Sequence, residues 1–372
     1  MSADATRGRK LVRRRRPWRS AAFLGVLATV LAACGNENGQ NSLDPKGPVA
    51  EKIDNLFLPV LFVAILIGVA VTIATVYVAI RFRQRPGRPD NPKQTHGSAP
   101  LEIGWTIVPA LILAVIAVPT ISTIFELAER PKGPEVLKVD VTGKQWWWEF
   151  SLPKQAMADK QIVTSTELHI PAGTKVLLRL HSDNVIHSFW VPELAGKKDV
   201  VPGRTNELTI EADEPGTYLG ACAEYCGLSH ADMRFRVVAQ PMADWEAWRD
   251  GQLEGPAKPW EGEIQDLTAT KYQCTNCHLF DDSSKATYGP NLTHLASRTT
   301  FAGGVYEVDR ANLTKWVMDA PSMISMNAKD CRQPPPATCV GMPSFTKNTP
   351  KGQPVMTQAD ADAIVSYLLG EK

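Results

Sequence analysis

The residue types best suited to chemistry in this chain gather in one short loop. Two cysteines, a histidine and a methionine lie within twelve positions, and another histidine precedes them; the set is His187, Cys222, Cys226, His230 and Met233. Thiolates and imidazoles suit copper, and a thioether can add a weak axial contact. Two thiolates and two imidazoles could instead hold tetrahedral zinc, and two cysteines alone could form a disulfide. The methionine and the peptide carbonyls of the loop favour a pair of copper ions bridged by both sulfurs.

A second reactive group lies further along, where Cys274, Cys277 and His278 form a C-x-x-C-H sequence. This spacing is typical of covalent attachment of a c-type haem. Two thioethers fix the porphyrin and the adjacent histidine becomes the proximal iron ligand. A zinc knuckle or a redox dithiol would use the cysteines, but neither needs the histidine. The motif therefore predicts a bound haem c.

Two long apolar runs precede these motifs and predict a membrane anchor. Residues 56–80 and 103–125 carry no charge, and 25 helical residues span roughly 37 Å, which is enough for a tilted transmembrane helix. The connection between the runs carries five bases: Arg81, Arg83, Arg85, Arg88 and Lys93. Because basic loops stay in the cytoplasm, both ends of the hairpin (51–130) face outside. The length of both runs argues against a buried soluble hairpin.

The N-terminus and the remaining cysteines fit an exported chain. Residues 1–33 form a basic region followed by an apolar run, as in a secretory signal peptide, and 34–50 predict a flexible tether. The ending Leu-Ala-Ala-Cys resembles a bacterial lipobox with Cys34 as the lipidated residue; the alternative is cleavage beside an incidental cysteine. Cys331 and Cys339 flank a proline-rich loop, and an external location favours a disulfide between them.

The external part divides into a β-rich unit and a helical unit. Short β-rich runs separated by Pro and Gly turns predict a β-sandwich or barrel over 131–245. Residues 246–262 predict a linker. The last unit, 263–372, shows helical patterns at 310–320 and 358–369, so we expect an all-α domain there.

The charged residues are divided unevenly between the predicted leader and the rest of the chain. The eight bases of the first 19 residues belong to the predicted leader; without them and Asp4, the chain has 32 Lys and Arg against 38 Asp and Glu. A mildly acidic mature chain argues against nucleic-acid binding and suits a basic electron donor.

The copper loop, the histidine before it and the apolar hairpin together resemble subunit II of the haem-copper cytochrome c oxidases over about 50–240. The resemblance implies a cupredoxin-like domain with a binuclear CuA centre. It makes Cys222 and Cys226 the bridging ligands, His187 and His230 the terminal ligands, and Met233 and the backbone oxygen of Glu224 the axial ligands. The Glu224 carboxylate would bind Mg at the contact with subunit I. Quinol oxidase subunit II, which has this fold without copper, is disfavoured because every ligand position is filled.

Trp146 and Glu102 carry the same resemblance, and Met342 resembles a residue of the cytochromes c. Trp146 in the Gln-Trp-Trp-Trp run matches the tryptophan through which electrons reach CuA, and Trp147 stands where the family has tyrosine. Glu102 matches a glutamate at the mouth of a proton channel into subunit I. Met342, followed by proline, is similar to the methionine that is the distal haem ligand in cytochromes c. Packing or interfacial roles are the alternatives for the tryptophans and for Glu102.

The resemblance implies a multidomain membrane protein: a two-helix transmembrane hairpin, a cupredoxin-like β-sandwich and an all-α cytochrome c domain on the outer face of a bacterial plasma membrane. Electrons from an external donor, such as cytochrome c or a bc-type complex, would pass through haem c and CuA to subunit I. There oxygen would be reduced to water with proton translocation, and subunit III is a further expected partner. A lipoprotein electron carrier, a copper-delivery protein and nitrous oxide reductase are weaker alternatives, because Glu102 and the hairpin are superfluous for the first two and no catalytic domain precedes the copper loop.

Overall fold

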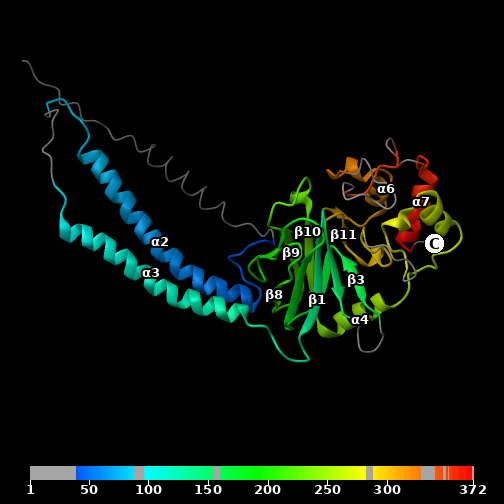
Figure 1. Ribbon diagram of the computed structural model, residues 1–372, viewed down its shortest axis with the longest axis horizontal. Coiled ribbons are helices and arrows are strands. Elements are labelled where there is room, and N and C mark those ends of the chain that lie inside the picture. The colour runs from blue at the N-terminus through cyan, green and yellow to red at the C-terminus, as the bar shows by residue number, and fades with distance from the viewer. Residues whose placement is uncertain are drawn as a thin grey trace, which may run out of the picture.

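The computed structural model describes residues 39–87, 96–153, 160–281, 288–327, 340–346, 349–350 and 352–370. The predicted signal peptide, Cys34, Cys331 and Cys339 lie outside these residues. The described chain runs from a long helical hairpin through a β-sandwich to a C-terminal unit on the side of the sandwich away from the hairpin (Figure 1).

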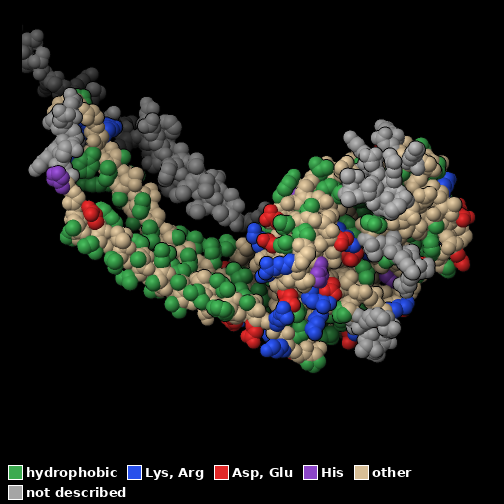
Figure 2. Space-filling model, viewed as in Figure 1, with side chains coloured by type: hydrophobic (Ala, Val, Ile, Leu, Met, Phe, Trp, Pro, Cys, Tyr) green, Lys and Arg blue, Asp and Glu red, His purple; other side chains and the backbone are tan. Residues whose placement is uncertain are grey.

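The hairpin consists of α2 (Pro48–Arg81) and α3 (Ala99–Ala128). Proline in the first turn of each helix costs no hydrogen bond, because the N–H groups there have no intrahelical acceptor. Apolar side chains cover the outside of both helices (Figure 2), and both are long and apolar enough to cross a membrane. Lys52 near the start of α2 pairs with Glu126 near the end of α3, so this ion pair lies at one end of the hairpin. The predicted hairpin is confirmed.

Two five-stranded sheets pack face to face in the sandwich. One has the order β3-β2-β1-β5-β8 and the other β4-β10-β9-β6-β7. Two neighbouring pairs, β1 with β5 and β4 with β10, are parallel, and the other pairs are antiparallel. The strands are β1 (Leu137–Lys144), β2 (Trp147–Leu152), β3 (Ile162–Ser165), β4 (Glu167–Pro171), β5 (Val176–Ser182), β6 (His187–Trp190), β7 (Lys198–Val200), β8 (Asn206–Ile210), β9 (Gly216–Cys222) and β10 (Arg234–Gln240).

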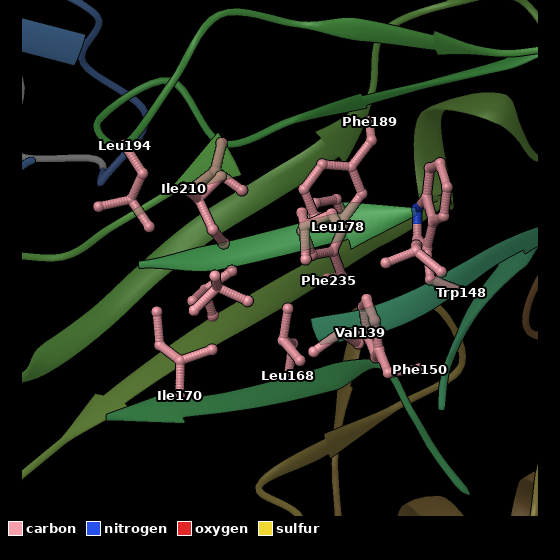
Figure 3. Close-up of a cluster of buried hydrophobic side chains, with 14 of the residues drawn as sticks. Val139, Trp148, Phe150, Leu168, Ile170, Leu178, Phe189, Leu194, Ile210 and Phe235 are labelled. Atoms are coloured by element: carbon pink, nitrogen blue, oxygen red, sulfur yellow. The ribbon is translucent and has the colours of Figure 1, made fainter. Parts of the chain in front are cut away.

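Inward-facing aromatic and aliphatic side chains from both sheets form the core of the sandwich (Figure 3). Along β10, buried residues alternate with more exposed ones, as expected for a strand with one face on a core. Trp148 of β2 is fully buried and contacts Phe189 and Phe235 edge to face, with ring centroids 5.4 and 5.6 Å apart. Trp148 is therefore a core residue, as the packing alternative for this tryptophan expected.

The connection to the C-terminal unit begins with α4 (Met242–Leu253). Trp245 of this helix is buried against the sandwich core, and its indole donates to the His169 carbonyl over 3.1 Å. The first part of the predicted linker is thus a helix packed on the sandwich.

The C-terminal unit contains only two α-helices longer than three residues among its described residues, α6 (Arg310–Asp319) and α7 (Gln358–Leu368). Asp309 and Thr357 cap their N-termini by accepting from Asn312 and Asp360 backbone N–H groups. Shorter turns are η1 (His230–Asp232) in the sandwich, then α5 (Glu263–Gln265), η2 (Asp266–Lys271), η3 (Cys274–Asn276), η4 (Leu295–Ser297) and η5 (Ala320–Ser322).

The C-terminal unit also contains a small hairpin. Strands β11 (Thr300–Phe301) and β12 (Tyr306–Glu307) pair in antiparallel fashion. The turn between them passes through Ala302, Gly303 and Gly304 at positive φ, which two glycines make possible. The expectation of an all-α domain is therefore wrong, because this glycine-containing segment folds back on itself instead of continuing as helix.

Candidate metal centre

The two sulfurs of the predicted copper loop lie at the end of β9. Cys222 is the last residue of that strand, and Cys226 follows in the loop before η1. Both are buried and free, with their Sγ atoms 3.8 Å apart. The disulfide alternative is therefore not what the fold adopts, and both sulfurs are available to a metal.

His187 reaches the same sulfurs from β6, the strand beside β9. Its Nδ1 lies 3.9 Å from the Cys222 Sγ, and the ring is fully buried. Its Nε2 lies 3.2 Å from the Asn184 Oδ1, a contact that orients the ring with Nδ1 toward the sulfurs. The donor atoms of His187, Cys222 and Cys226 all lie within 4.8 Å of one another.

The rest of the predicted set surrounds Cys226 and Cys222. The His230 Nδ1 is 3.6 Å and the Met233 Sδ 3.7 Å from the Cys226 Sγ. The Glu224 carbonyl oxygen is 3.2 Å from the Cys222 Sγ, while the Glu224 side chain is exposed. The fold thus brings together every predicted donor, with a sulfur pair at the middle. Soft thiolates between imidazole, thioether and carbonyl donors fit copper.

The paired thiols share one hydrogen bond, which makes one of them strongly acidic. The contact with the Cys226 thiol, opposed by burial and reinforced by His187, lowers the pKa of Cys222 to about 3. The same contact, together with burial, raises the pKa of Cys226. The contacts of the pair therefore favour the thiolate form of Cys222, and thiolate is the form that binds metals.

Trp146 lies directly against the loop. Its Nε1 donates to the Cys226 carbonyl over 3.1 Å, and the amide of Gln145 donates to the same oxygen over 2.6 Å. Trp147 points elsewhere, with the Lys144 ammonium 5.0 Å from its ring centre. Of the three consecutive tryptophans, Trp146 contacts the copper loop through a hydrogen bond.

The sequence did not single out Asn184, Gly143 and Gln145 as parts of the site. Asn184 had one available signal, its position three residues before His187. Gly143 packs so closely that a Cβ there would lie 2.8 Å from the His187 ring and 3.3 Å from Trp148. These contacts join segments distant in sequence, so spacing along the chain could not reveal them.

The predicted haem residues lie in the C-terminal unit. Cys274 begins η3, Cys277 follows it, and the His278 Nδ1 donates to the Pro290 carbonyl over 2.8 Å. This bond leaves the Nε2 of His278 for iron. Burial lowers the pKa of His278, against that hydrogen bond, and so favours the neutral ring that can bind metal. Burial also raises the pKa of Cys274 to about 12.

Met342 borders the same apolar cluster as Cys274. Its backbone N–H donates to the Met326 Sδ over 3.2 Å, which ties the two methionine-bearing segments together. An apolar cluster edged by both cysteine and methionine suits a porphyrin face, so the residues present fit a haem.

Glu102 is far from both sites in the chain and sits in the first turn of α3, exposed. It lies at the end of the hairpin opposite the Lys52–Glu126 pair, because it begins the helix that Glu126 nearly ends. Its carboxylate is thus at the end of the membrane anchor that lies away from the sandwich (Figure 1).

A two-helix membrane anchor joined to a sandwich with a buried thiol–imidazole cluster defines a membrane-bound redox subunit that binds a soft metal. Two family models match the chain: the periplasmic domain of cytochrome c oxidase subunit II over 137–240, and the transmembrane domain of the same subunit over 36–123. The chain belongs to the cytochrome c oxidase subunit II family, and is therefore a subunit of a haem-copper terminal oxidase.

The individual proteins that this chain resembles are also subunits of oxidases. Cytochrome c oxidase subunit 2 of Alkalihalophilus pseudofirmus is 35% identical over 362 residues, covering 94% of this chain and 97% of that one. The corresponding subunit of Bacillus sp. strain PS3 is 34% identical, covering 82% and 89%. Quinol oxidase subunit 2 of Bacillus spizizenii is 35% identical over 254 residues, covering 66% and 74%. The first alignment must include most of the residues after 240, so that relative shares the C-terminal unit.

Among solved structures, the periplasmic domain of subunit II of cytochrome oxidase of Bradyrhizobium japonicum aligns with 33% of this chain and 95% of its own, at 26% identity and a TM-score of 0.30.

Proposed function

We propose that this subunit holds a binuclear CuA centre in the sandwich. Cys222 and Cys226 would hold the two copper ions through their sulfurs, together with His187 and His230 through Nδ1. Met233 and the Glu224 carbonyl complete the two sites. The compact donor set carries this proposal: four other donor atoms lie within 4 Å of one of the two sulfurs, which are themselves 3.8 Å apart.

We further propose that the C-terminal unit is a cytochrome c domain. Cys274 and Cys277 attach the haem, His278 binds its iron through Nε2, and Met342 is the distal ligand. The bond from His278 to the Pro290 carbonyl orients the imidazole and makes it a stronger donor. The long alignment with the Alkalihalophilus subunit supports a shared role for this unit.

Electrons reach the sandwich from an external donor, such as cytochrome c or a bc-type complex, through the C-terminal unit. Haem and CuA supply one-electron carriers. The protein holds their ligands rigidly: Cys222, Cys226 and Met233 are part of the sandwich core, so little rearrangement accompanies a change of charge. The indole of Trp146 lies against the copper loop and donates a hydrogen bond to the Cys226 carbonyl. Trp146 is therefore the proposed point at which electrons enter the copper site.

The partner subunit I completes the enzyme. Electrons pass to its haem, where oxygen is reduced to water and protons are translocated across the bacterial plasma membrane. The Glu224 carboxylate, which is exposed, would bind Mg against that partner, and Glu102, in the first turn of α3, would lie at the mouth of a proton channel at the cytoplasmic end of that helix. Subunit III, a lipid on Cys34 and a disulfide between Cys331 and Cys339 remain parts of the proposal that rest on the sequence.

Quinol oxidase subunit 2 is a second candidate, since the sequence identity to the Bacillus spizizenii protein is also 35%. The cluster of donor side chains supports the first of the two. A quinol-oxidising subunit does not need paired thiols with imidazoles at their sides, and the thiols here lie in a complete donor set.

Spectroscopy of the full chain, purified with haem attached and copper supplied, tests the assignment. A c-type haem band and a mixed-valence two-copper paramagnetic signal are expected, and Cys226→Ser removes the copper signal while keeping the haem. Haem without that signal in the unsubstituted chain makes the protein a haem-only carrier, and stoichiometric zinc makes the thiol site a zinc site.

A further inference from the structure

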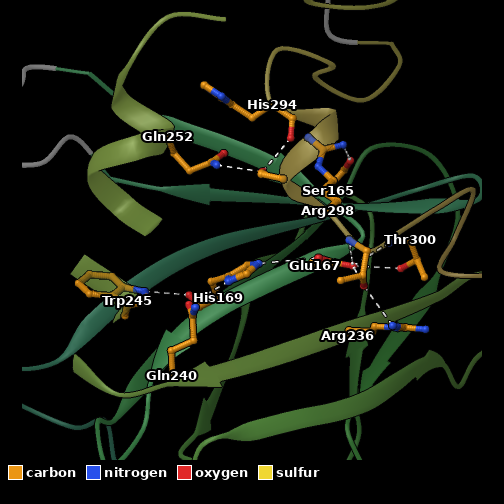
Figure 4. A network of polar contacts seen from close by, with 12 residues as sticks. Ser165, Glu167, His169, Arg236, Gln240, Trp245, Gln252, His294, Arg298 and Thr300 are labelled. Carbon is orange, nitrogen blue, oxygen red and sulfur yellow. Dashed lines mark hydrogen bonds and ion pairs between the residues drawn. The ribbon is translucent and has the colours of Figure 1, made fainter. Parts of the chain in front are cut away.

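A buried carboxylate on the sandwich is bound by the C-terminal unit (Figure 4). Glu167 begins β4, and its side chain is only 1% exposed. Its Oε1 accepts four hydrogen bonds from two consecutive residues: from the backbone N–H groups of Thr299 and Thr300 over 2.9 and 3.0 Å, and from their hydroxyls over 2.5 and 3.2 Å. An ionised carboxylate survives burial only with such partners.

Arg298, the residue before this pair, makes the reverse connection. Its buried guanidinium donates from Nη1 to the Ser165 hydroxyl over 2.8 Å and from Nη2 to the Asn291 carbonyl over 2.6 Å. Asn291 in turn donates to the Val163 carbonyl of β3 over 3.1 Å. A buried charge on each unit is therefore bound by the other unit, and separating the units would take all four of these hydrogen bonds from Glu167 and the Ser165 bond from Arg298.

A second contact between the units lies on the copper loop. The Arg234 backbone N–H donates to the Gly303 carbonyl over 2.9 Å, and Ser229, buried between Cys226 and His230, donates to the Ser325 carbonyl. The Gly303 backbone comes so close that a Cβ there would lie 2.1 Å from the Asp232 carbonyl and 3.5 Å from that of Trp146. Ser325 precedes Met326, whose sulfur holds the Met342 backbone.

We propose that Glu167 and Arg298 form a clamp that fixes the C-terminal unit on the sandwich and seats Gly303 and Ser325 against the copper loop. The clamp joins β11, two residues before Gly303, to the sheet that carries the loop, so it sets the position of the second contact. The two residues are positioning residues: they touch neither copper nor haem. Resting on the proposed function, the inference adds that the C-terminal unit is a docked donor and not a mobile one on a tether.

The distinction has a kinetic consequence. A flexible tether gives its two ends an effective concentration in the millimolar range and lets the donor sample many orientations. A docked donor holds a single orientation, so transfer does not wait for a search. The rate of electron transfer within the chain should then be independent of solvent viscosity.

Hydrogen exchange in the full chain tests the clamp without using enzymatic activity. Glu167→Gln removes the charge that holds the Thr299 and Thr300 amides, and their exchange should become faster by about tenfold or more, the effect of losing a bond to a charged group. Asp140→Asn is the matched control, because it breaks the pairing with Arg179 and His181 inside the sandwich. Unchanged exchange in Glu167→Gln overturns the clamp.

Flash-induced electron transfer from haem to copper, measured at several viscosities, supplies the functional readout. The unsubstituted chain and Asp140→Asn should show no viscosity dependence, whereas Glu167→Gln should transfer more slowly and in proportion to fluidity. If Glu167→Gln fails to fold, Arg298→Lys takes its place. This variant keeps the charge but loses the two-pronged donor, so its transfer should be slower than in the unsubstituted chain and should depend on viscosity. A viscosity-dependent rate in the unsubstituted chain contradicts the docked donor. Absence of the copper or haem signal would contradict the proposed function, while the exchange experiment would still test the clamp.

Discussion

Trp146 and Cys226 are joined by a hydrogen bond from the indole Nε1 to the backbone carbonyl, 3.1 Å long, across 80 positions of sequence. The bond places an aromatic ring beside a loop whose sulfurs, imidazoles and thioether form one compact cluster. Electron transfer benefits from a short, rigid connection, and this bond is one that a substitution can remove alone.

Replacing Trp146 with Phe keeps an aromatic ring and removes the hydrogen bond. We expect a stability loss of about 1 kcal/mol, the usual net value of one such bond, with copper content unchanged. Reduction of the copper by the attached haem should slow severalfold in stopped-flow absorption. Trp147→Phe is the control, since its ring packs against Lys144 and not against the loop. Equal rates in Trp146→Phe and the unsubstituted chain would remove Trp146 from the electron route.

Gly143 lies against the His187 ring, so Gly143→Ala should disturb copper binding from outside the ligand set. The added Cβ would meet the ring at 2.8 Å and Trp148 at 3.3 Å. Crowding of this kind costs about 1–3 kcal/mol, and it should shift the ligand ring. Titration with copper, followed by paramagnetic resonance, should show weaker binding or an altered signal. Gly251→Ala, where a Cβ meets nothing within 4 Å, should bind copper normally.

Met342 and Met326 have different predicted roles although their segments touch. Met342→Leu should lose the methionine–iron bond, and the reduction potential of the haem should fall because methionine ligation raises it. Met326→Leu should keep that ligation and lose only the contact from the Met342 N–H. Redox titration with absorption spectroscopy distinguishes the variants. A normal potential in Met342→Leu and a lowered one in Met326→Leu would exchange the two assignments.

Glu167 should make stability depend on pH in acid. Burial alone would raise its pKa, but hydrogen bonds from His169, Thr299 and Thr300 lower it to about 2 from an ordinary 4.5. A carboxyl with a lowered folded-state pKa stabilises the fold above its unfolded pKa, and this contribution disappears as the pH falls from 4.5 toward 2. The contribution at neutral pH is about 3 kcal/mol. His169 on the same strand, Arg298 from the C-terminal unit, and Arg236 on β10, which donates to the Thr299 hydroxyl over 3.1 Å, are charged or titratable groups near it.

Calorimetry from pH 5 to pH 2 measures this dependence. The unsubstituted chain should lose stability steeply across the window, and Glu167→Gln should begin less stable and change less. Asp360, whose pKa the Lys271 and Tyr272 contacts also lower to about 2, pairs with the half-exposed Lys271 near the surface, where an ion pair contributes little. Asp360→Asn should therefore keep the steep loss, and a flat profile in Asp360→Asn but not in Glu167→Gln would contradict this account.

Sequence patterns predicted the elements whose signals are local. The sequence predicts the hairpin because uncharged runs of this length are rare outside membrane-spanning helices. It predicts α7 because Thr357 is an N-cap residue before a periodic apolar face. The five β-rich runs predicted from the sequence correspond to β1, β2, β5, β8 and β10. The sequence did not predict β4: its residues alternate polar and apolar, but the strand is only five residues long, and all five are buried, the two polar ones included.

The residue types and spacing of the chain determined by themselves which donors are present: Cys222, Cys226, His230 and Met233 in one loop, and Cys274, Cys277 and His278 in another. Ligand chemistry depends on side-chain type, and a short loop brings neighbours together in most conformations. Only the tertiary structure decided the remainder. Sheet pairing brings His187 beside Cys222, Trp146 binds the Cys226 carbonyl across 80 positions, and Glu167 binds Thr299 across 132 positions. Such contacts depend on strand order and packing, which no local pattern in the chain specifies.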